Sequence, residues 1–204
     1  GTGYAMVQAT LSIARLNLAA KCVGASKRCL QLADRFARRR SISNGPMREN
    51  SVVRTRLAEL IALVIATDRL GRTLARSLDH RIEVPHEVFL GVKVAASEML
   101  WEVVVAASQL LGGRGYEEPN VLARILRDAR SFLLSEGATE PLLSMIGARA
   151  TEGEHSVQGF IRRTLDCHSL SLDLERSAQV LRDRCSRDGR SDADWANFLV
   201  GRLA

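Results

Sequence analysis

The sequence has few aromatic residues and few prolines, and this scarcity bears on the fold class. Only 4% of the residues are Phe, Trp or Tyr, and four prolines occur in 204 residues. Aromatic residues are enriched in strands and proline interrupts helices, whereas Ala, Leu and Arg, which are abundant here, favour helices. The composition therefore favours an all-α protein over a sheet-based one.

The few cysteines and histidines form no metal or redox motif. None of the four cysteines belongs to a C-x-x-C pair, and the four histidines fall in predicted loops or at helix ends. Zinc sites and catalytic triads need such residues at defined spacings. The sequence therefore predicts reduced structural thiols and no metal site, and it gives no histidine a catalytic role.

Segments typical of membranes, secretion or nucleic-acid binding are also absent. Every apolar run is interrupted by charge before the roughly 20 residues that a bilayer requires, and no recognition motif for DNA or RNA occurs. We therefore expect a cytoplasmic protein with no membrane span and no nucleic-acid partner. Residues 1–150 carry 21 Lys and Arg against 14 Asp and Glu, whereas residues 151–204 carry 8 against 9, so the basic excess belongs to the first part. Such an excess is compatible with ligands that carry phosphates.

Apolar residues at intervals of three and four predict three long helices. The first covers about Tyr4–Arg39, the second about Ser51–Asp79, and the third follows Pro85 and includes Val88–Leu111. Long helices joined by short turns are typical of an antiparallel bundle. The third is apolar around most of its circumference, which favours the centre of a bundle or a subunit interface. We therefore expect a homo-oligomer, and we expect that Lys93 and Glu98 in this helix are not both freely solvated.

The stretch RILRDARSFLLSEGATEPLLSMIGARA, residues 124–150, contains a helix break in apolar surroundings. Gly137 weakens a helix interior, and Pro141 is tolerated only in a first helical turn. One helix, which Pro119 is expected to open, therefore ends near Leu134, and Pro141 is expected to restart the helical pattern. Glu136 at this junction is either a solvated loop residue or a carboxylate held partly out of water.

The pattern changes after residue 150. TEGEHS has the composition of a linker, and shorter helices are expected over Val157–Asp166, Leu170–Cys185 and Asp192–Leu203, the last two separated by SRDGRSDAD. The sequence therefore predicts an all-α, antiparallel up-and-down four-helix bundle over residues 1–150, with a small helical extension over residues 151–204.

Residues 1–150 carry short motifs in a characteristic order. GTGY opens the chain, LSIAR contains Arg15, VKVAASEML contains Lys93, and QLLGGRGY, LRDAR and SEG follow. Together these motifs resemble the carboxy-terminal helical domain of the acyl-CoA dehydrogenase family, over residues 1 to about 150. The spacing from Gln109 through Gly112-Gly113 to Glu136-Gly137 matches that family without a gap.

The resemblance implies roles for particular residues. Glu136 matches the family's catalytic base, which removes the α-proton of an acyl thioester while the β-hydrogen leaves as hydride to the N5 atom of FAD. A thioester α-proton is weakly acidic, so the base needs a raised pKa, which the apolar neighbours Leu133, Leu134 and Leu142 are expected to provide. Arg40 matches the arginine at the FAD phosphates, and Gln109, Gly112 and Gly113 match the segment that meets the cofactor of a neighbouring subunit.

The chain departs from the family pattern in ways that keep two functions open. Ser43-Asn44, Ser51 and Ala138 replace the usual aromatic-glycine pair, glutamine and threonine, and the family's amino-terminal helical domain and β-domain are missing from residues 1–204. We therefore expect the chain to be inactive alone and to need those domains in cis or in trans, with an acyl thioester of coenzyme A or of a carrier protein as substrate. The alternative is a non-catalytic helical assembly domain in which residues 151–204 bind a partner.

Overall fold

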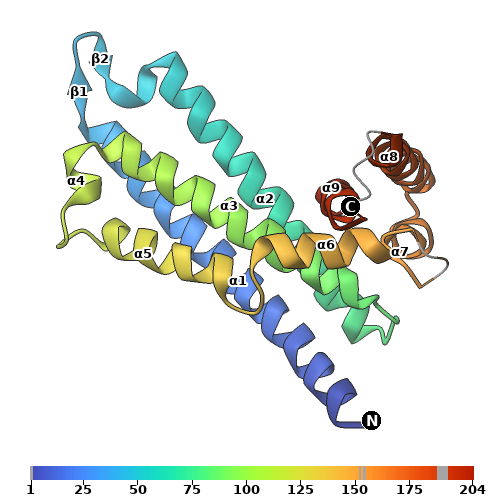
Figure 1. The fold of residues 1–204 in the computed structure, drawn as a ribbon. Coiled ribbons are helices and arrows are strands. Elements are labelled where there is room, and N and C mark those ends of the chain that lie inside the picture. The colour runs from blue at the N-terminus through green and yellow to red at the C-terminus, as the bar shows by residue number, and fades with distance from the viewer. Residues whose placement is uncertain (1, 152, 154, 188–192) are drawn as a thin grey trace. The chain divides into compact units, whose positions relative to one another are not determined.

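The computed structural model describes residues 2–151, 153, 155–187 and 193–204, which are mostly helical (Figure 1). They separate into two compact units, each considered by itself. The bundle unit contains residues 17–73 and 95–135, and the α6 unit contains residues 1–16, 74–94 and 136–204. None of the helices in the described ranges has a stretch long and apolar enough to cross a bilayer.

The elements follow one another with short connections. Their bounds are α1 Thr2–Arg39, β1 Ser41–Ile42, β2 Gly45–Pro46, the 3-10 turn η1 Met47–Glu49, α2 Ser51–Asp79, α3 His86–Leu111, α4 Gly113–Tyr116, α5 Val121–Leu134, α6 Thr139–Arg149, α7 Val157–Thr164, α8 His168–Arg187 and α9 Ala193–Leu203. The all-α prediction is confirmed, and the second long helix has the predicted bounds. Gly1, which begins the predicted GTGY motif, lies outside the described residues.

In the bundle unit, α1, α2, α3 and α5 form the predicted antiparallel up-and-down bundle (Figure 1). The α1–α2 connection is a hairpin in which Ile42 pairs with Gly45, and Gly45 adopts a left-handed φ of 109°. Asn50 then caps α2, because its side chain accepts hydrogen bonds from the amides of Val52 and Val53 at 3.0 and 3.3 Å. The sequence predicts a turn at this place but not the two short strands.

The start of α5 differs from its prediction. Pro119 was expected to open this helix, but the helix begins at Val121. Asn120 is its N-cap, since its side chain accepts from the amide of Leu122 at 3.0 Å and donates to the carbonyl of Arg114 at 2.8 Å. Asn is a preferred N-cap residue, because its side-chain oxygen satisfies an amide of the first turn that has no partner within the helix.

Most of α3 is buried within this chain. Of its large apolar side chains, Trp101 and Val105 remain exposed, by 36% and 44%. Lys93 is completely buried while Glu98 is exposed, so the expectation that the two are not both solvated is confirmed. The apolar circumference of α3 is thus largely satisfied inside the chain, and self-association stays a prediction.

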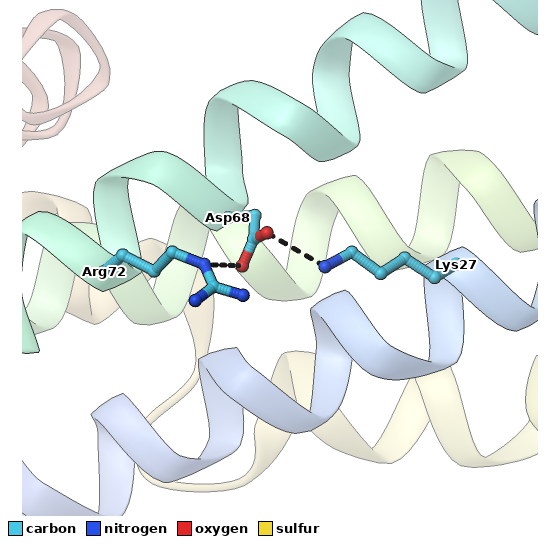
Figure 2. A network of polar contacts seen from close by, with 3 residues as sticks. All are labelled: Lys27, Asp68 and Arg72. Carbon is cyan, nitrogen blue, oxygen red and sulfur yellow. Dashed lines mark hydrogen bonds and ion pairs between the residues drawn. The ribbon is translucent and has the colours of Figure 1, made fainter.

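An ionic network links α1 to α2 in the bundle unit (Figure 2). Asp68 of α2 accepts hydrogen bonds from Lys27 of α1 at 2.9 Å and from Arg72 of α2 at 3.1 Å. The bond from Lys27, followed by that from Arg72, lowers the pKa of Asp68. The network therefore stabilises the fold at pH values above the ordinary pKa of an aspartate side chain. This contribution is lost as the pH falls through the lowered pKa of Asp68.

We expect Asp68→Asn to destabilise the chain at pH 7 by about 0.5–1 kcal/mol, because both bonds are partly exposed to solvent. The substitution should also reduce the loss of stability on acidification. Urea denaturation between pH 3 and pH 7 measures both effects. Glu98→Gln, which neutralises an exposed acid of the same unit, is the matched control, and equal effects of the two substitutions would contradict the network's role.

In the α6 unit, the helices after residue 150 pack against one another, and α9 also packs on α6. Helix α9 lies along α6, and α8 contacts both α7 and α9. Ala150, Ala178 and Val200 form a small core there, and Arg182 donates to the carbonyl oxygen of Gly147 at 3.0 Å. The described residues of this part contain the three predicted helices, with some ends shifted by two residues, and the predicted start of the last helix at Asp192 lies outside the described residues. The two predicted linkers, TEGEHS and SRDGRSDAD, fall partly outside the described residues, and the boundary after residue 150 stays a prediction.

Candidate active site and cofactor pocket

The loop between α5 and α6 holds Glu136 in an unusual backbone conformation. Glu136 has a φ of 59° and Gly137 a φ of 111°, so two consecutive residues lie in the left-handed region. This region costs a residue with a side chain roughly 1–2 kcal/mol. Other contacts must therefore hold Glu136 in place.

Two buried basic side chains hold the backbone of this loop. Nε of Arg15 donates to the carbonyl oxygen of Glu136 at 3.1 Å, and Nζ of Lys93 donates to the carbonyl oxygen of Gly137 at 2.7 Å. Arg15 is 6% exposed and Lys93 is fully buried. Hydrogen bonds from charged donors are about twice as strong as neutral ones. The loop is thus fixed by residues 121 and 44 positions earlier in the chain.

Arg15 itself lies in a polar group that the sequence analysis did not identify. Its Nη1 is 3.3 Å from Nε2 of His86, and Nδ1 of His86 is 3.1 Å from the hydroxyl of Ser12. Burial lowers the pKa of Arg15, and the negative charge of Glu136 opposes this shift. His86 begins α3, and nothing in its sequence neighbourhood indicates partners on α1.

The side chain of Glu136 is half-buried. Of the three leucines expected around it, Leu142 is 3% exposed, Leu133 is half-buried, and Leu134 is 57% exposed. The expectation that these apolar neighbours shield the carboxylate stays a prediction. The backbone of Glu136 is thus held by hydrogen bonds, while its side chain is only half-buried.

The four predicted cofactor residues line one pocket of the bundle unit. This pocket has a volume of about 870 Å³ and is lined by Arg40 at the end of α1 and by Gln109, Gly112 and Gly113 at the end of α3. The structure thus brings together residues about 70 positions apart in the sequence. Glu136 belongs to the α6 unit and is considered separately from this pocket.

Basic and glycine residues give this pocket the chemistry of a phosphate site. Arg35, Arg39 and Arg114, which the sequence analysis did not single out, line it with Arg40, and Glu117 is the one acidic residue of the described lining. Arg114 lies over the ring of Phe36 at 5.9 Å. Guanidinium groups bind phosphate oxygens in a bidentate manner, so this lining fits an anionic, phosphate-bearing ligand.

Two glycines at the end of α3, Gly112 and Gly113, leave room for a ligand to approach the backbone. Gly112 has a φ of 59°, which favours glycine. A Cβ added at Gly112 or Gly113 would meet no described heavy atom within 4 Å outside its immediate neighbourhood. Packing within the described residues therefore does not require these two glycines to lack a side chain, and the space beside them is open to a ligand.

Within the described ranges, no group of three or more His, Cys, Asp or Glu side chains is arranged to hold a metal ion.

Three of the residues that depart from the family pattern lie after α1. Ser43 and Asn44 form the loop between β1 and β2, and Ser51 begins α2. They lie near the chain segment that leads from Arg40, but they are not part of the described pocket lining.

The comparison with protein families decides the assignment. The family model described as "Acyl-CoA dehydrogenase, C-terminal domain" matches residues 1–151. This chain belongs to the acyl-CoA dehydrogenase family. The resemblance found in the motifs is thereby confirmed, and residues 152–204 lie outside the matched region.

Individual acyl-CoA dehydrogenases support this assignment. The chain is 30% identical over 147 residues to a mitochondrial isovaleryl-CoA dehydrogenase of Oryza sativa, covering 72% of this chain and 36% of that protein. It is 31% identical over 150 residues to a cyclohex-1-ene-1-carbonyl-CoA dehydrogenase of Geobacter metallireducens, covering 74% and 39%. Among solved structures, butyryl-CoA dehydrogenase of Megasphaera elsdenii matches with a TM-score of 0.69 and 26% identity over 72% of this chain and 38% of that one.

The matched proteins are much longer than this chain. It spans little more than a third of the length of these relatives. What the whole relatives do is therefore not transferred directly to residues 1–204.

Proposed function

We propose that this chain is the carboxy-terminal helical part of an FAD-dependent dehydrogenase that converts an acyl thioester to its α,β-enoyl form. The observation that carries the proposal is the loop at Glu136, whose carbonyls are held by buried Arg15 and Lys93. Strained backbone that its surroundings hold in place clusters at functional sites. The pocket at Arg40, Gln109, Gly112 and Gly113 supports the cofactor assignment.

In the proposed reaction, the Glu136 carboxylate takes the α-proton of the thioester, so an O–H bond forms as the C–H bond breaks. When bound, FAD supplies the acceptor for the hydride that leaves the β-carbon. The electron pair of the α C–H bond then becomes the new double bond. Fixing the loop keeps the base in place without reorganisation during the reaction, which is how a positioned general base contributes to rate.

The residues of the pocket fit the cofactor's phosphates. Arg40 and its neighbouring arginines provide donors, and the glycines permit backbone amides to approach phosphate oxygens. Gln109, Gly112 and Gly113 would meet the cofactor of a second subunit. Exposed Ile61, Ile65, Trp101 and Val105 in the bundle unit support such a homo-oligomer.

The remaining domains, substrate and location are part of the same proposal. The amino-terminal helical domain and the β-domain would be supplied in cis or in trans, with coenzyme A or a carrier protein holding the acyl group. We place the assembled enzyme in the cytoplasm. The Oryza relative is named as mitochondrial, so cell fractionation distinguishes the two locations.

Reduction of flavin tests this function. The chain is combined with its amino-terminal and β-domains, and bleaching of the flavin by acyl-CoA substrates is followed under anaerobic conditions. Bleaching with release of the enoyl product supports the proposal. A folded assembly that neither binds FAD nor bleaches contradicts it and favours the helical assembly domain, which the departures Ser43-Asn44, Ser51 and Ala138 support.

We expect Arg40→Ala to weaken FAD binding by about 10- to 100-fold, because a hydrogen bond to a charged group contributes about 1.5–3 kcal/mol. Titration of the apoenzyme with FAD, followed by flavin fluorescence, measures the change. Arg69→Ala is the matched control, since Arg69 is an exposed arginine of the bundle unit outside the described pocket lining. Equal losses in both variants would show that overall charge, not this pocket, governs binding.

A further inference from the structure

His86 lies at the start of α3 within reach of two residues of α1. Its Nδ1 is 3.1 Å from Oγ of Ser12, and its Nε2 is 3.3 Å from Nη1 of Arg15. The Ser12 hydroxyl also lies 3.0 Å from the carbonyl oxygen of Gln8, to which it donates. All of these residues belong to the α6 unit.

The chemistry of the partners determines where the imidazole carries its proton. A guanidinium group has only donors, so Nε2 of His86 must accept from Arg15 and carries no hydrogen. The Ser12 proton is directed to Gln8, so the Ser12 oxygen accepts from an Nδ1–H group. The contacts therefore require the neutral imidazole with its hydrogen on Nδ1.

The surrounding charges favour this neutral form. Burial, then the charge of Arg15, and also that of Arg149 on α6, lower the pKa of His86, while neighbouring Glu87 opposes them. Glu87 is 7% exposed and lies 3.6 Å from Arg149, so its charge is partly balanced by that arginine. A protonated His86 would place an N–H group against the guanidinium of Arg15 and remove the acceptor.

The contact matters because Arg15 links His86 to the candidate base. Through Nη1 it binds His86, and through Nε it binds the carbonyl oxygen of Glu136. Two separate contacts fix the plane of the guanidinium, whereas the Nε contact alone leaves it free to turn. Glu136 needs such an anchor, because its left-handed φ of 59° is unfavourable by itself.

We propose that neutral His86 is a positioning residue for the Glu136 loop: it orients Arg15 against the Glu136 carbonyl, and protonation of His86 loosens this loop. Where it concerns catalysis, the inference rests on the proposed function of Glu136. Its structural part does not, since it can be measured on the 204-residue chain without cofactor or substrate.

The first test is nitrogen-15 NMR of the histidine rings in this chain, with His86 assigned by comparison with His86→Gln. We expect the Nδ1–H form for His86 at pH 7.5, and protonation at a pH below the ordinary imidazole pKa of about 6.5. An Nε2–H form, or protonation of His86 at or above that ordinary pKa, would overturn the inference.

The second test measures amide hydrogen exchange at Gly137, whose amide belongs to the same peptide group as the Glu136 carbonyl. After correction for the intrinsic pH dependence, we expect exchange to become about 10- to 100-fold faster as His86 protonates, the factor for losing one charge-assisted hydrogen bond. His86→Gln keeps an acceptor for Arg15 but does not titrate, so its exchange should stay slow at every pH. His86→Leu should be fast throughout.

His155→Gln is the matched control, because His155 is an exposed histidine of the same unit. It should keep the wild-type profile. If His86→Leu does not fold, the wild-type and His86→Gln profiles still decide the matter. A wild-type Gly137 exchange rate without a step at His86 protonation would overturn the inference.

A kinetic test connects the loop to catalysis in the reconstituted enzyme. We expect the wild-type kcat to fall at acid pH as His86 protonates, and His86→Gln to remove that step while KM is unchanged. If Glu136→Gln reduces flavin as fast as wild type, the proposed base is wrong although the NMR and exchange results stand. If the NMR and exchange measurements contradict the expected results, the proposed role of His86 is wrong, whether or not Glu136 is the base.

Discussion

Glu136→Gln in the reconstituted flavoenzyme is expected to slow flavin reduction by an acyl thioester by about a hundred- to ten-thousand-fold, the usual contribution of a positioned general base. The amide keeps the size of the carboxylate but cannot accept the α-proton. Stopped-flow measurement of flavin bleaching gives the rate directly. The bound flavin and the helical fold should be unchanged, because Arg15 and Lys93 contact backbone carbonyls of this loop.

A glutamate close in sequence provides the control for this substitution. Glu140 lies in the first turn of α6 and is exposed, so Glu140→Gln should leave the rate of flavin reduction within about twofold. If Glu136→Gln instead stays within about threefold of wild type while folded, Glu136 is a solvated loop residue. If it unfolds the chain, the carboxylate is a structural partner of Arg15, whose pKa its charge raises.

The helices and the break at Glu136 could be predicted because their signals are local. Apolar periodicity gave the bounds of α2, and Gly137 with Pro141 located the α5–α6 junction. Apolar character alone does not give the buried face of α1: Val7 is 55% exposed, while Ser26 and Ala33 are fully buried. Periodicity finds a helix more reliably than it finds the exact face, since small residues allow close packing on either side of a stripe.

The candidate site was predictable only in part. Resemblance to a family supplied Glu136 and the four pocket residues, but the contacts that hold Glu136 join residues from α1, α3 and the α5–α6 loop. His86 gave no signal, because a histidine at a helix start is ordinary and its partners lie more than 70 positions away. Such contacts depend on tertiary packing, which no local pattern records.

Helices α6 and α9 approach each other at two glycines. A Cβ added at Gly147 of α6 would overlap the carbonyl oxygen of Asn197, and one added at Gly201 of α9 would overlap the carbonyl oxygen of Leu143. Both overlaps are with backbone, which cannot move aside as a flexible side chain can. Residues 193–203 therefore pack closely on a helix that begins three residues after Glu136.

We expect Gly147→Ala to destabilise the α6 unit by about 1–3 kcal/mol or more, because the added methyl group forces α6 and α9 apart. Urea denaturation measures the loss, and hydrogen exchange should show that protection falls first in α9. Gly91→Ala is the matched control: Gly91 lies in α3 of the same unit, and its Cβ would meet no described heavy atom within 4 Å. There the same substitution should stabilise by up to about 1 kcal/mol, since alanine is the better helix former.

Gly147→Ala should thus lower the free energy of unfolding, whereas Gly91→Ala should raise it. Gly201→Ala should resemble Gly147→Ala, and the double variant should cost less than the two single costs combined, because once the helices have separated the second methyl group meets less resistance. If Gly147→Ala stabilises the chain as Gly91→Ala does, α9 does not lie against α6. Residues 193–203 would then contribute nothing to the helix that follows the candidate base.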